Sequence, residues 1–306
     1  AATGAAPASN SEGDGDARAK PWVVLVTGLN GIRKTTSIYQ DWFPDLLSEA
    51  LVPPTTTTNN TTPTGSSQTT TPTSTTTQQT QTFPLSQLPC GDNSFFRQLD
   101  HMMSILVNDE FQRLYQLTDV GPYAILKDGI FTRYRTLAEL LGVVLIREAQ
   151  RLKLNILVET SGKDVAMFDY VDTFFPDNGG TTDCAYHKLV LHFAINDIGY
   201  AERSVDARMT QEILDGRSAV TSQPFDIRQI INANAGGPYG SEVLKSVLSD
   251  SDAVWEQIVK GEVEAGKSWY KASIQIEANN PPDAWWERAV KEDGTLGDTT
   301  FSFPVR

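Results

Sequence analysis

The segment 23–37, VVLVTGLNGIRKTTS, constrains the fold of this chain more than any other. A short apolar run ends at Gly28, as expected of a buried parallel strand. The residues after it follow the spacing G-x-x-x-x-G-K-[S/T] of a phosphate-binding loop, with Lys34 and Thr35 at its last two positions. Glycines let several backbone N–H groups point at one anion, and a helix that follows adds the positive end of its dipole. The segment therefore predicts a strand, a phosphate-binding loop and a helix.

In such a loop, Lys34 is expected to reach the β- and γ-phosphates of ATP, and the Thr35 hydroxyl is expected to bind Mg²⁺. Arg33 stands at the second glycine of the pattern, and Gly31 partly restores the flexibility lost there. A tight glycine turn beside a solvated lysine is the alternative interpretation. The expected nucleotide-binding residues are Gly28, Leu29, Asn30, Gly31, Ile32, Arg33, Lys34, Thr35 and Thr36.

Apolar runs and helical periodicity alternate along the rest of the chain. We expect strands over 22–28, 154–160, 187–195 and 269–278, the last nearer an edge of the sheet. We expect helices over 34–51, 95–118, 133–152, 164–175, 199–216, 241–262 and 281–294. Residues 137–145 contain an apolar face, and Gly216 is expected to cap its helix. Strands separated by such helices favour right-handed crossovers, so the predicted class is α/β, a three-layer α/β/α sandwich with a mostly parallel sheet of the P-loop NTPase or kinase type.

Two stretches lack the apolar residues that a core needs. Residues 1–20 are small and polar, and residues 53–82 are uncharged and more than half threonine. Neither can bury enough surface to offset the entropy of ordering, so we expect a disordered tail and a disordered Thr-rich insertion. Residues 21–306 are expected to form one domain that this insertion interrupts, because loop-closure entropy grows only slowly with loop length.

The net charge of −13 and the pI near 4.7 exclude several classes of partner. Because no cluster of Lys and Arg exists, neither nucleic acid nor an anionic membrane surface is expected to bind. No stretch is long and apolar enough for a transmembrane helix. Cys90 and Cys184 form neither a disulfide framework nor a zinc cluster, so the cytoplasm or another reducing compartment is the default expectation, with organelle targeting left open.

A polar cluster, ETSGK, follows the strand expected over 154–160. Ligands collect at the carboxyl ends of parallel strands, so Glu159, Ser161 and Lys163 are candidates for binding a polar substrate. The alternative for Ser161 is that it caps a helix that starts near Asp164.

These motifs resemble those of the zeta-toxin family of phosphate-loop kinases. The family's loop reads G-x-x-G-x-G-K-T, and GLNGIRKT aligns with it except at Arg33. The family's E-G-T-G-R motif resembles ETSGK at 159–163. Its D-N-D-x-F motif aligns with DNSFF at 92–96, where Asp92 is kept and Ser94 replaces the Asp that the family uses as base.

The family also places arginines on a lid helix, where they clamp the transferred phosphoryl group. The stretch 201–217 offers Arg203, Arg208 and Arg217, with Arg208 preferred. The resemblance covers roughly 22–235 and implies a kinase with a helical lid that uses ATP and Mg²⁺ to phosphorylate a hydroxyl of a small molecule. In the family, this acceptor is a sugar nucleotide, UDP-N-acetylglucosamine.

The resemblance implies a role for each matched residue. Lys34 would hold ATP, and Thr35 and Asp92 would lie on the metal. Asp92 would also orient or deprotonate the acceptor hydroxyl. Arg208 and Arg217 would stabilise the phosphoryl charge. The sugar nucleotide would be bound by Glu159, Ser161 and Lys163.

Two other functions fit the same residues. The first is a regulatory module that binds or hydrolyses a nucleotide as a switch. The second is a catalytically silent binding protein in which Arg33 and Ser94 have removed the activity. The residue pattern by itself supports nucleotide binding or phosphoryl transfer and specifies no sugar, and an antitoxin-like protein partner is left open.

Overall fold

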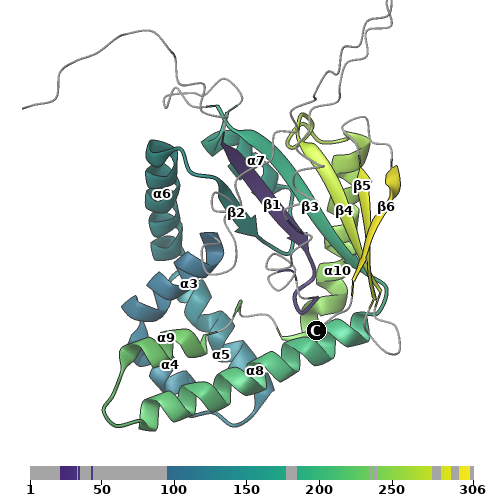
Figure 1. Cartoon of the computed structure of the whole chain (residues 1–306). Coiled ribbons are helices and arrows are strands. Elements are labelled where there is room, and N and C mark those ends of the chain that lie inside the picture. Colours follow the sequence, from purple (N-terminus) through teal and green to yellow (C-terminus); the bar gives the residue numbers. More distant parts are fainter. Residues whose placement is uncertain are drawn as a thin grey trace, which may run out of the picture.

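The protein is described by a computed structural model (Figure 1). It describes residues 21–32, 34, 43, 95–176, 185–234, 236–237 and 240–277, together with the backbone of 284–290 and 296–303. The tail 1–20, the Thr-rich insertion 53–82 and several predicted site residues lie outside these ranges, namely Arg33, Thr35, Thr36, Asp92 and Ser94, as do Cys90 and Cys184.

Six strands in the described ranges form one sheet in the order β2-β1-β3-β4-β5-β6. They are β1 (Trp22–Gly28), β2 (Ile156–Glu159), β3 (His187–Ile195), β4 (Tyr270–Glu277), β5 (Ala284–Val290) and β6 (Leu296–Phe303). The first four strands in this order pair in parallel, and β5 pairs antiparallel with β4 and with β6. The α/β class and the mostly parallel sheet expected from the sequence are confirmed.

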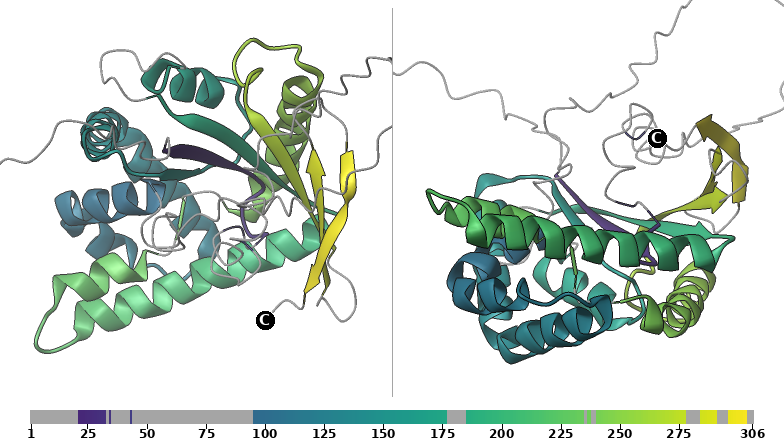
Figure 2. Two further views of the ribbon diagram at one scale, coloured as in Figure 1. Left: turned by 45° about the horizontal axis from the view of Figure 1, so that its top comes forward. Right: turned by 90° about the horizontal axis from the view of Figure 1, so that it is seen from below.

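Apart from α6, the described helices form two groups around this sheet. Figure 1 and Figure 2 show α3, α4, α5 and α9 gathered beside the long helix α8, while α7 and α10 lie along the sheet. Their bounds are α3 (Phe95–Leu106), α4 (Asn108–Leu114), α5 (Val120–Arg133), α6 (Arg135–Leu152), α7 (Ala166–Phe174), α8 (Ile198–Thr221), α9 (Ile227–Ala233) and α10 (Leu244–Lys260), with the 3₁₀ turn η4 (Ser241–Val243) before α10. Within the described part of the chain, no helix combines the length and apolarity needed to cross a membrane.

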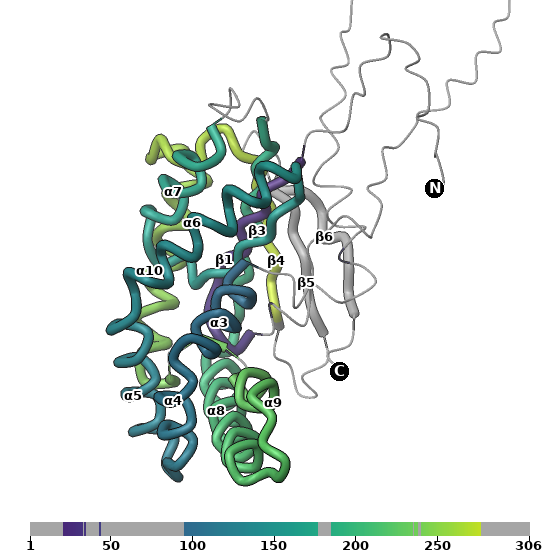
Figure 3. Tube along the Cα trace, turned by 90° about the vertical axis from the view of Figure 1, so that its left-hand side faces the viewer, coloured from purple at the N-terminus to yellow at the C-terminus, as the bar shows by residue number. Residues whose placement is uncertain are grey.

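Alternate side chains of β1 point to opposite faces of the sheet, as the strand period of two requires. Val23 and Leu25 pack with Phe168 of α7 and Ile258 of α10, which lie on the same side of the sheet in Figure 3. Val24 and Val26 belong to a second cluster that includes the first turns of α8. Apolar layers on both faces are compatible with a three-layer α/β/α arrangement.

The path of the chain makes the end of β1 the natural place for a ligand. From β1 the chain crosses to β2 on one side, and it later returns past β1 to β3 on the other side. The connections at the carboxyl ends of the strands therefore diverge on either side of β1, and open α/β sheets bind their ligands at such switch points.

The sequence-based prediction of a helix over 281–294 is wrong. Residues 284–290 form strand β5, which pairs with β4 on one side and with β6 on the other. For the same reason β4 is an interior strand of the described sheet and does not lie at its edge. The two prolines before this segment are typical of a helix start, but pairing with β4 outweighs this local preference.

One helical prediction also needs correction, and one helix was not predicted. The helix expected over 95–118 is divided at Val107, whose φ of −115° and ψ of 36° leave the helical region, into α3 and α4. Helix α5 was not expected, because Gly121, Pro122 and Gly129 weaken its pattern. The apolar face over 137–145 is partly exposed: Leu140 and Val144 are each 62% exposed, while its other leucines are half-buried.

Gly216 does not end its helix. Helix α8 continues to Thr221, and Gly216 is buried where the helix passes over the ring of Tyr115. A Cβ atom at position 216 would lie 2.2 Å from the ring atom Cγ of Tyr115, which real contacts do not allow. The glycine is therefore kept for close packing of α8 on the end of α4.

We expect Gly216→Ala to lower the free energy of unfolding by about 1–3 kcal/mol, because the added methyl overpacks a buried contact. The measurement is urea unfolding followed by circular dichroism. Gly129→Ala is the matched control: this glycine also lies inside a helix, but nothing is within 4 Å of a Cβ atom there. The control should raise stability by about 0.5–1 kcal/mol. Equal effects of both substitutions would contradict the packing argument.

Candidate active site

The loop after β1 has a shape that only glycine permits at two positions. Gly28 has φ of 124°, and a Cβ atom there would lie 2.3 Å from the carbonyl oxygen of Phe193 on β3. Gly31 has φ of 85°, and its Cβ atom would lie 2.5 Å from the carbonyl oxygen of Ala201 on α8. The loop is therefore pressed against β3 on one side and against α8 on the other.

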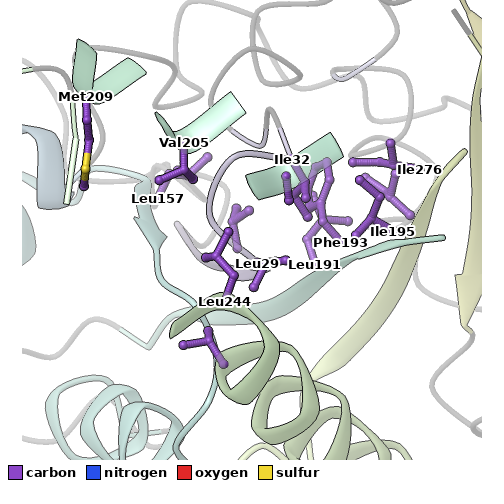
Figure 4. Close-up of a cluster of buried hydrophobic side chains, with 14 of the residues drawn as sticks. Leu29, Ile32, Leu157, Leu191, Phe193, Ile195, Val205, Met209, Leu244 and Ile276 are labelled. Atoms are coloured by element: carbon purple, nitrogen blue, oxygen red, sulfur yellow. The ribbon is translucent and has the colours of Figure 1, made fainter. Parts of the chain in front are cut away.

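Two apolar side chains anchor the same loop in the core. Leu29 and Ile32 are both 0% exposed, and Figure 4 draws them with Leu191 and Phe193 of β3 and Val205 of α8. Alternation of glycines with buried apolar residues gives this loop a fixed path over the end of the sheet.

The Lys34 side chain folds back onto the backbone of the same loop. Its ammonium Nζ donates hydrogen bonds to the carbonyl oxygens of Gly28 at 2.6 Å and Leu29 at 2.8 Å, and the residue is only 7% exposed. The alternative of a solvated lysine beside a glycine turn is therefore wrong. The same arrangement means that an anion entering the loop has to compete with two carbonyl groups for this ammonium.

The segment after β2 is tied to this loop. The N–H of Thr160 donates to the carbonyl of Val26 at 2.8 Å, which continues the pairing of β1 with β2. The carbonyl of Ser161 accepts hydrogen bonds from the N–H of Gly28 at 3.2 Å and from the hydroxyl of Ser251 at 2.7 Å. The two sequence motifs, 159–163 and 28–34, thus lie side by side.

The capping alternative for Ser161 receives no support. The first free N–H group of α7, that of Ala166, donates to the side chain of Asp164 at 2.9 Å. Asp164 therefore supplies the cap, and the Ser161 side chain lines the cleft described next.

A cleft of about 1130 Å³ opens beside these motifs. Its polar wall contains Asn30, Gly31 and Lys34 from the loop, Glu159, Thr160, Ser161 and Lys163 from the end of β2, Arg97 and Asp100 from α3, and Arg208 from α8. The apolar side chains of its lining come largely from α3, α6 and α7. All described residues that the sequence predicted as substrate-binding therefore line one cleft.

The structure separates the two predicted arginines. Arg208 lines the cleft, where its guanidinium donates to the carbonyl of Gly237 at 3.3 Å. Arg217 donates to the carbonyl of Leu117 at 2.6 Å and is not among the residues that line the cleft. The two positions are about two and a half helical turns apart, so they project from opposite sides of α8. Arg203 is largely exposed and pairs with Asp197 at 3.5 Å.

A buried charge cluster behind Arg208 was not expected from the sequence. Lys127 of α5 donates to Glu212 of α8 at 2.7 Å and to the carbonyl of Gly236 at 2.7 Å. The hydroxyl of Tyr123 donates to the same Glu212 oxygen at 2.8 Å, and Arg208 lies 3.6 Å from the other. Arg208 and Glu212 have the i,i+4 spacing that could have signalled this pair, but Lys127 is distant in sequence.

Burial sets the electrostatics of Lys34. It lowers the pKa of the ammonium from 10.5 to about 8, an effect that the nearby Glu159 carboxylate opposes and the nearby Arg208 guanidinium reinforces. These three charges therefore act on one another across the polar wall of the cleft.

The described residues contain no group of three His, Cys, Asp or Glu side chains that could hold a metal ion by themselves. A magnesium ion that accompanies a nucleotide takes most of its ligands from phosphates and water and only one or two from the protein. The predicted protein ligands, Thr35 and Asp92, lie outside the described residues. The polar, carboxylate-containing wall is compatible with a nucleotide-bound Mg²⁺.

Comparison of the chain with protein-family models, with curated proteins and with solved structures gives no match. The resemblance to zeta toxins therefore rests on the motif residues alone.

The buried Lys34 predicts a stability that depends on pH. Between pH 8 and 10.5 the unfolded chain binds more protons at Lys34 than the folded chain, so stability rises with pH in this window. Below pH 8 the full cost of burying the charge remains, and above pH 10.5 it is gone. Between pH 8 and 10.5, the free energy of unfolding of the wild type should rise by about 3 kcal/mol relative to that of Lys34→Met.

The measurement is the free energy of unfolding in urea at several pH values. Lys245→Met is the control, because Lys245 is exposed on α10 and its substitution should keep the slope of the wild type. Parallel curves for the wild type and Lys34→Met would show that Lys34 is not buried as described.

Proposed function

We propose that the protein is an ATP-dependent phosphotransferase that resembles the zeta toxins. It transfers the γ-phosphate of ATP to a hydroxyl of a small molecule, and a UDP-amino sugar such as UDP-N-acetylglucosamine is the first candidate acceptor. The observation that carries the proposal is the convergence of Lys34, Glu159 and Arg208 on one cleft at the switch point of the sheet.

The chemistry of phosphoryl transfer matches these groups. Its transition state spreads negative charge over the transferred group, and catalysis rests largely on positioning and on fixed positive charge. Lys34 and Arg208 provide two cations on the cleft wall, and Arg208 is held by Gly237 and Glu212. Nucleotide-bound Mg²⁺ supplies further neutralisation of the β- and γ-phosphates.

Binding of ATP requires the loop to release Lys34. A phosphate oxygen carries a full negative charge and accepts a stronger hydrogen bond from an ammonium than a carbonyl does. Lys34 would therefore exchange the carbonyls of Gly28 and Leu29 for phosphate oxygens. The end of β2 supplies the acceptor side: Glu159 and Ser161 offer oxygen acceptors, and Lys163 lies exposed at the cleft.

A catalytically silent nucleotide-binding protein is the second candidate. The observation that favours it is the same closed loop, in which both hydrogen bonds from Lys34 are made to the protein itself. The two functions differ in turnover, because a silent protein would gain thermal stability from ATP without releasing ADP.

We expect Lys34→Met to lower kcat/KM for phosphate transfer by about 100- to 1000-fold, because a charge that meets the transferred group is lost. Transfer is measured with radiolabelled ATP, Mg²⁺ and a panel of sugar nucleotides. A wild type that releases no ADP, yet melts at a higher temperature with ATP, would instead establish the silent protein. A wild type without transfer, hydrolysis or thermal shift would contradict both functions.

Arg208→Lys and Arg217→Lys form a matched pair on one helix. We expect Arg208→Lys to lower the rate of transfer about 100-fold, because an ammonium cannot replace the planar guanidinium that reaches the cleft and Gly237 at once. Arg217→Lys should leave the rate unchanged, since Arg217 binds Leu117 away from the cleft. A larger loss at position 217 than at 208 would refute this assignment.

A further inference from the structure

Two carboxylates lie near Arg208, and their surroundings differ. Glu212 is 1% exposed, and its oxygens are engaged by Tyr123, Lys127 and Arg208. Both oxygens of this carboxylate are therefore already occupied by partners within the protein. Its hydrogen bonds join α5 to α8, which is a structural role.

Asp100 is the other carboxylate. It lies on α3 one turn after Arg97, and both side chains line the cleft. The residue keeps part of its surface exposed, whereas Leu99 and Met103 on the same helix are buried. Among the described residues, none donates a hydrogen bond to its carboxylate. Asp100 therefore presents free acceptor oxygens to the cleft, deep in the protein.

Charged groups from three helices act on the Asp100 carboxylate. Arg97 belongs to α3, Lys127 to α5, and Arg208 and Glu212 to α8. Burial raises the pKa of Asp100 from 3.8 to about 6, a rise to which Glu212 adds and which the three cations oppose. The carboxylate is thus mostly ionised at neutral pH and holds a proton more strongly than an ordinary aspartate.

Arg208 connects Asp100 with the phosphate-binding loop. Its charge acts on Asp100 and also on Lys34, and all three side chains belong to the lining of one cleft. A phosphoryl group held by Lys34 and Arg208 would share this cleft with the Asp100 carboxylate. A general base has to lie within reach of the attacking hydroxyl, and Asp100 lines the cleft that the acceptor would enter.

We propose that Asp100 is the general base that accepts the proton of the acceptor hydroxyl. This inference rests on the proposed function. The acceptor oxygen forms a bond to the γ-phosphorus as its O–H proton passes to the Asp100 carboxylate. The bond between the γ-phosphorus and the bridging oxygen breaks, and ADP leaves with its electron pair. Asp100 then returns its proton to solvent through the cleft.

This assignment differs from what the motif resemblance implies. The resemblance gives the role to Asp92 and leaves Ser94 at the position of the family's base, and both lie outside the described residues. Asp100 stands further along the chain, on the helix that begins at Phe95. Because Ser94 replaces the aspartate that the family uses as base, the Asp100 carboxylate would supply the proton acceptor in this chain.

The test compares the rate of phosphate transfer of Asp100→Asn with that of the wild type, using radiolabelled ATP, Mg²⁺ and UDP-N-acetylglucosamine. If the wild type does not label this sugar nucleotide, the rate of ATP hydrolysis, with water as the acceptor, is compared instead. We expect the substitution to lower kcat at least 100-fold, as loss of a general base does. The ATP-induced rise in melting temperature should remain. The wild-type rate should rise with pH to a plateau with a midpoint near 6, and this limb should be absent in Asp100→Asn.

Two further variants keep the test independent of folding. Asp109→Asn removes an exposed carboxylate of α4 outside the cleft and should leave the rate unchanged. Asp100→Glu keeps a carboxylate and should retain the pH-dependent limb at a reduced rate, which a merely structural role would not require. Asp100→Asn itself should melt at a higher temperature than the wild type at pH 7.5, because the cost of burying an ionised carboxylate is removed.

The outcomes separate the inference from the proposed function. A wild type that transfers phosphate in a Lys34-dependent way, together with an equally active Asp100→Asn, would overturn the role of Asp100 and leave the function standing. Retention of the pH limb in Asp100→Asn would overturn it as well. A wild type that neither transfers phosphate nor hydrolyses ATP would overturn both.

Discussion

Burial of the Lys34 ammonium at the end of β1 is the interaction on which the geometry of the cleft depends. Removing an ammonium from water is unfavourable unless hydrogen-bond acceptors replace the water, and the carbonyls of Gly28 and Leu29 do so. Gly28 adopts a positive φ against the backbone of β3, a conformation and a close approach that a residue with a Cβ atom would not allow. The loop is therefore shaped by its contacts with the sheet and α8 as much as by its own residues.

The same end of the sheet gathers the other charged groups. Pairing of β1 with β2 brings Glu159 opposite Val26, and continued pairing fixes Ser161 beside Gly28. On the other side of the cleft, the Lys127–Glu212 pair joins α5 to α8 and holds the carbonyl of Gly236. A buried ion pair is weak evidence for stability, because desolvation offsets its attraction. In this protein, its evident consequence is positional, since it holds Arg208 and the turn at 236–237 at the cleft wall.

Sequence patterns predicted the strands that are buried on both faces more accurately than the other elements. Strands 22–28 and 187–195 have the observed bounds, because a continuous apolar run has few alternatives in an α/β fold. Residues 284–290 were mistaken for a helix, because their strand conformation depends on pairing with β4, which no local pattern reveals. In the site, Glu159, Ser161 and Lys163 could be predicted, because each lies within a few residues of a strand end. Lys127 could not, because its partner Glu212 is 85 positions away.

The sequence by itself determined the class of fold, the place of the loop after the first strand and the polar segment after the second. These features are local in the chain, and their physical basis is hydrophobic periodicity and the backbone freedom of glycine. Only the tertiary structure decided that Arg208 faces the cleft and Arg217 does not, and that Asp100 and Glu212 have unlike surroundings. A helical pattern shows which residues share a face, but the direction of that face is set by packing between helices that lie far apart in the sequence.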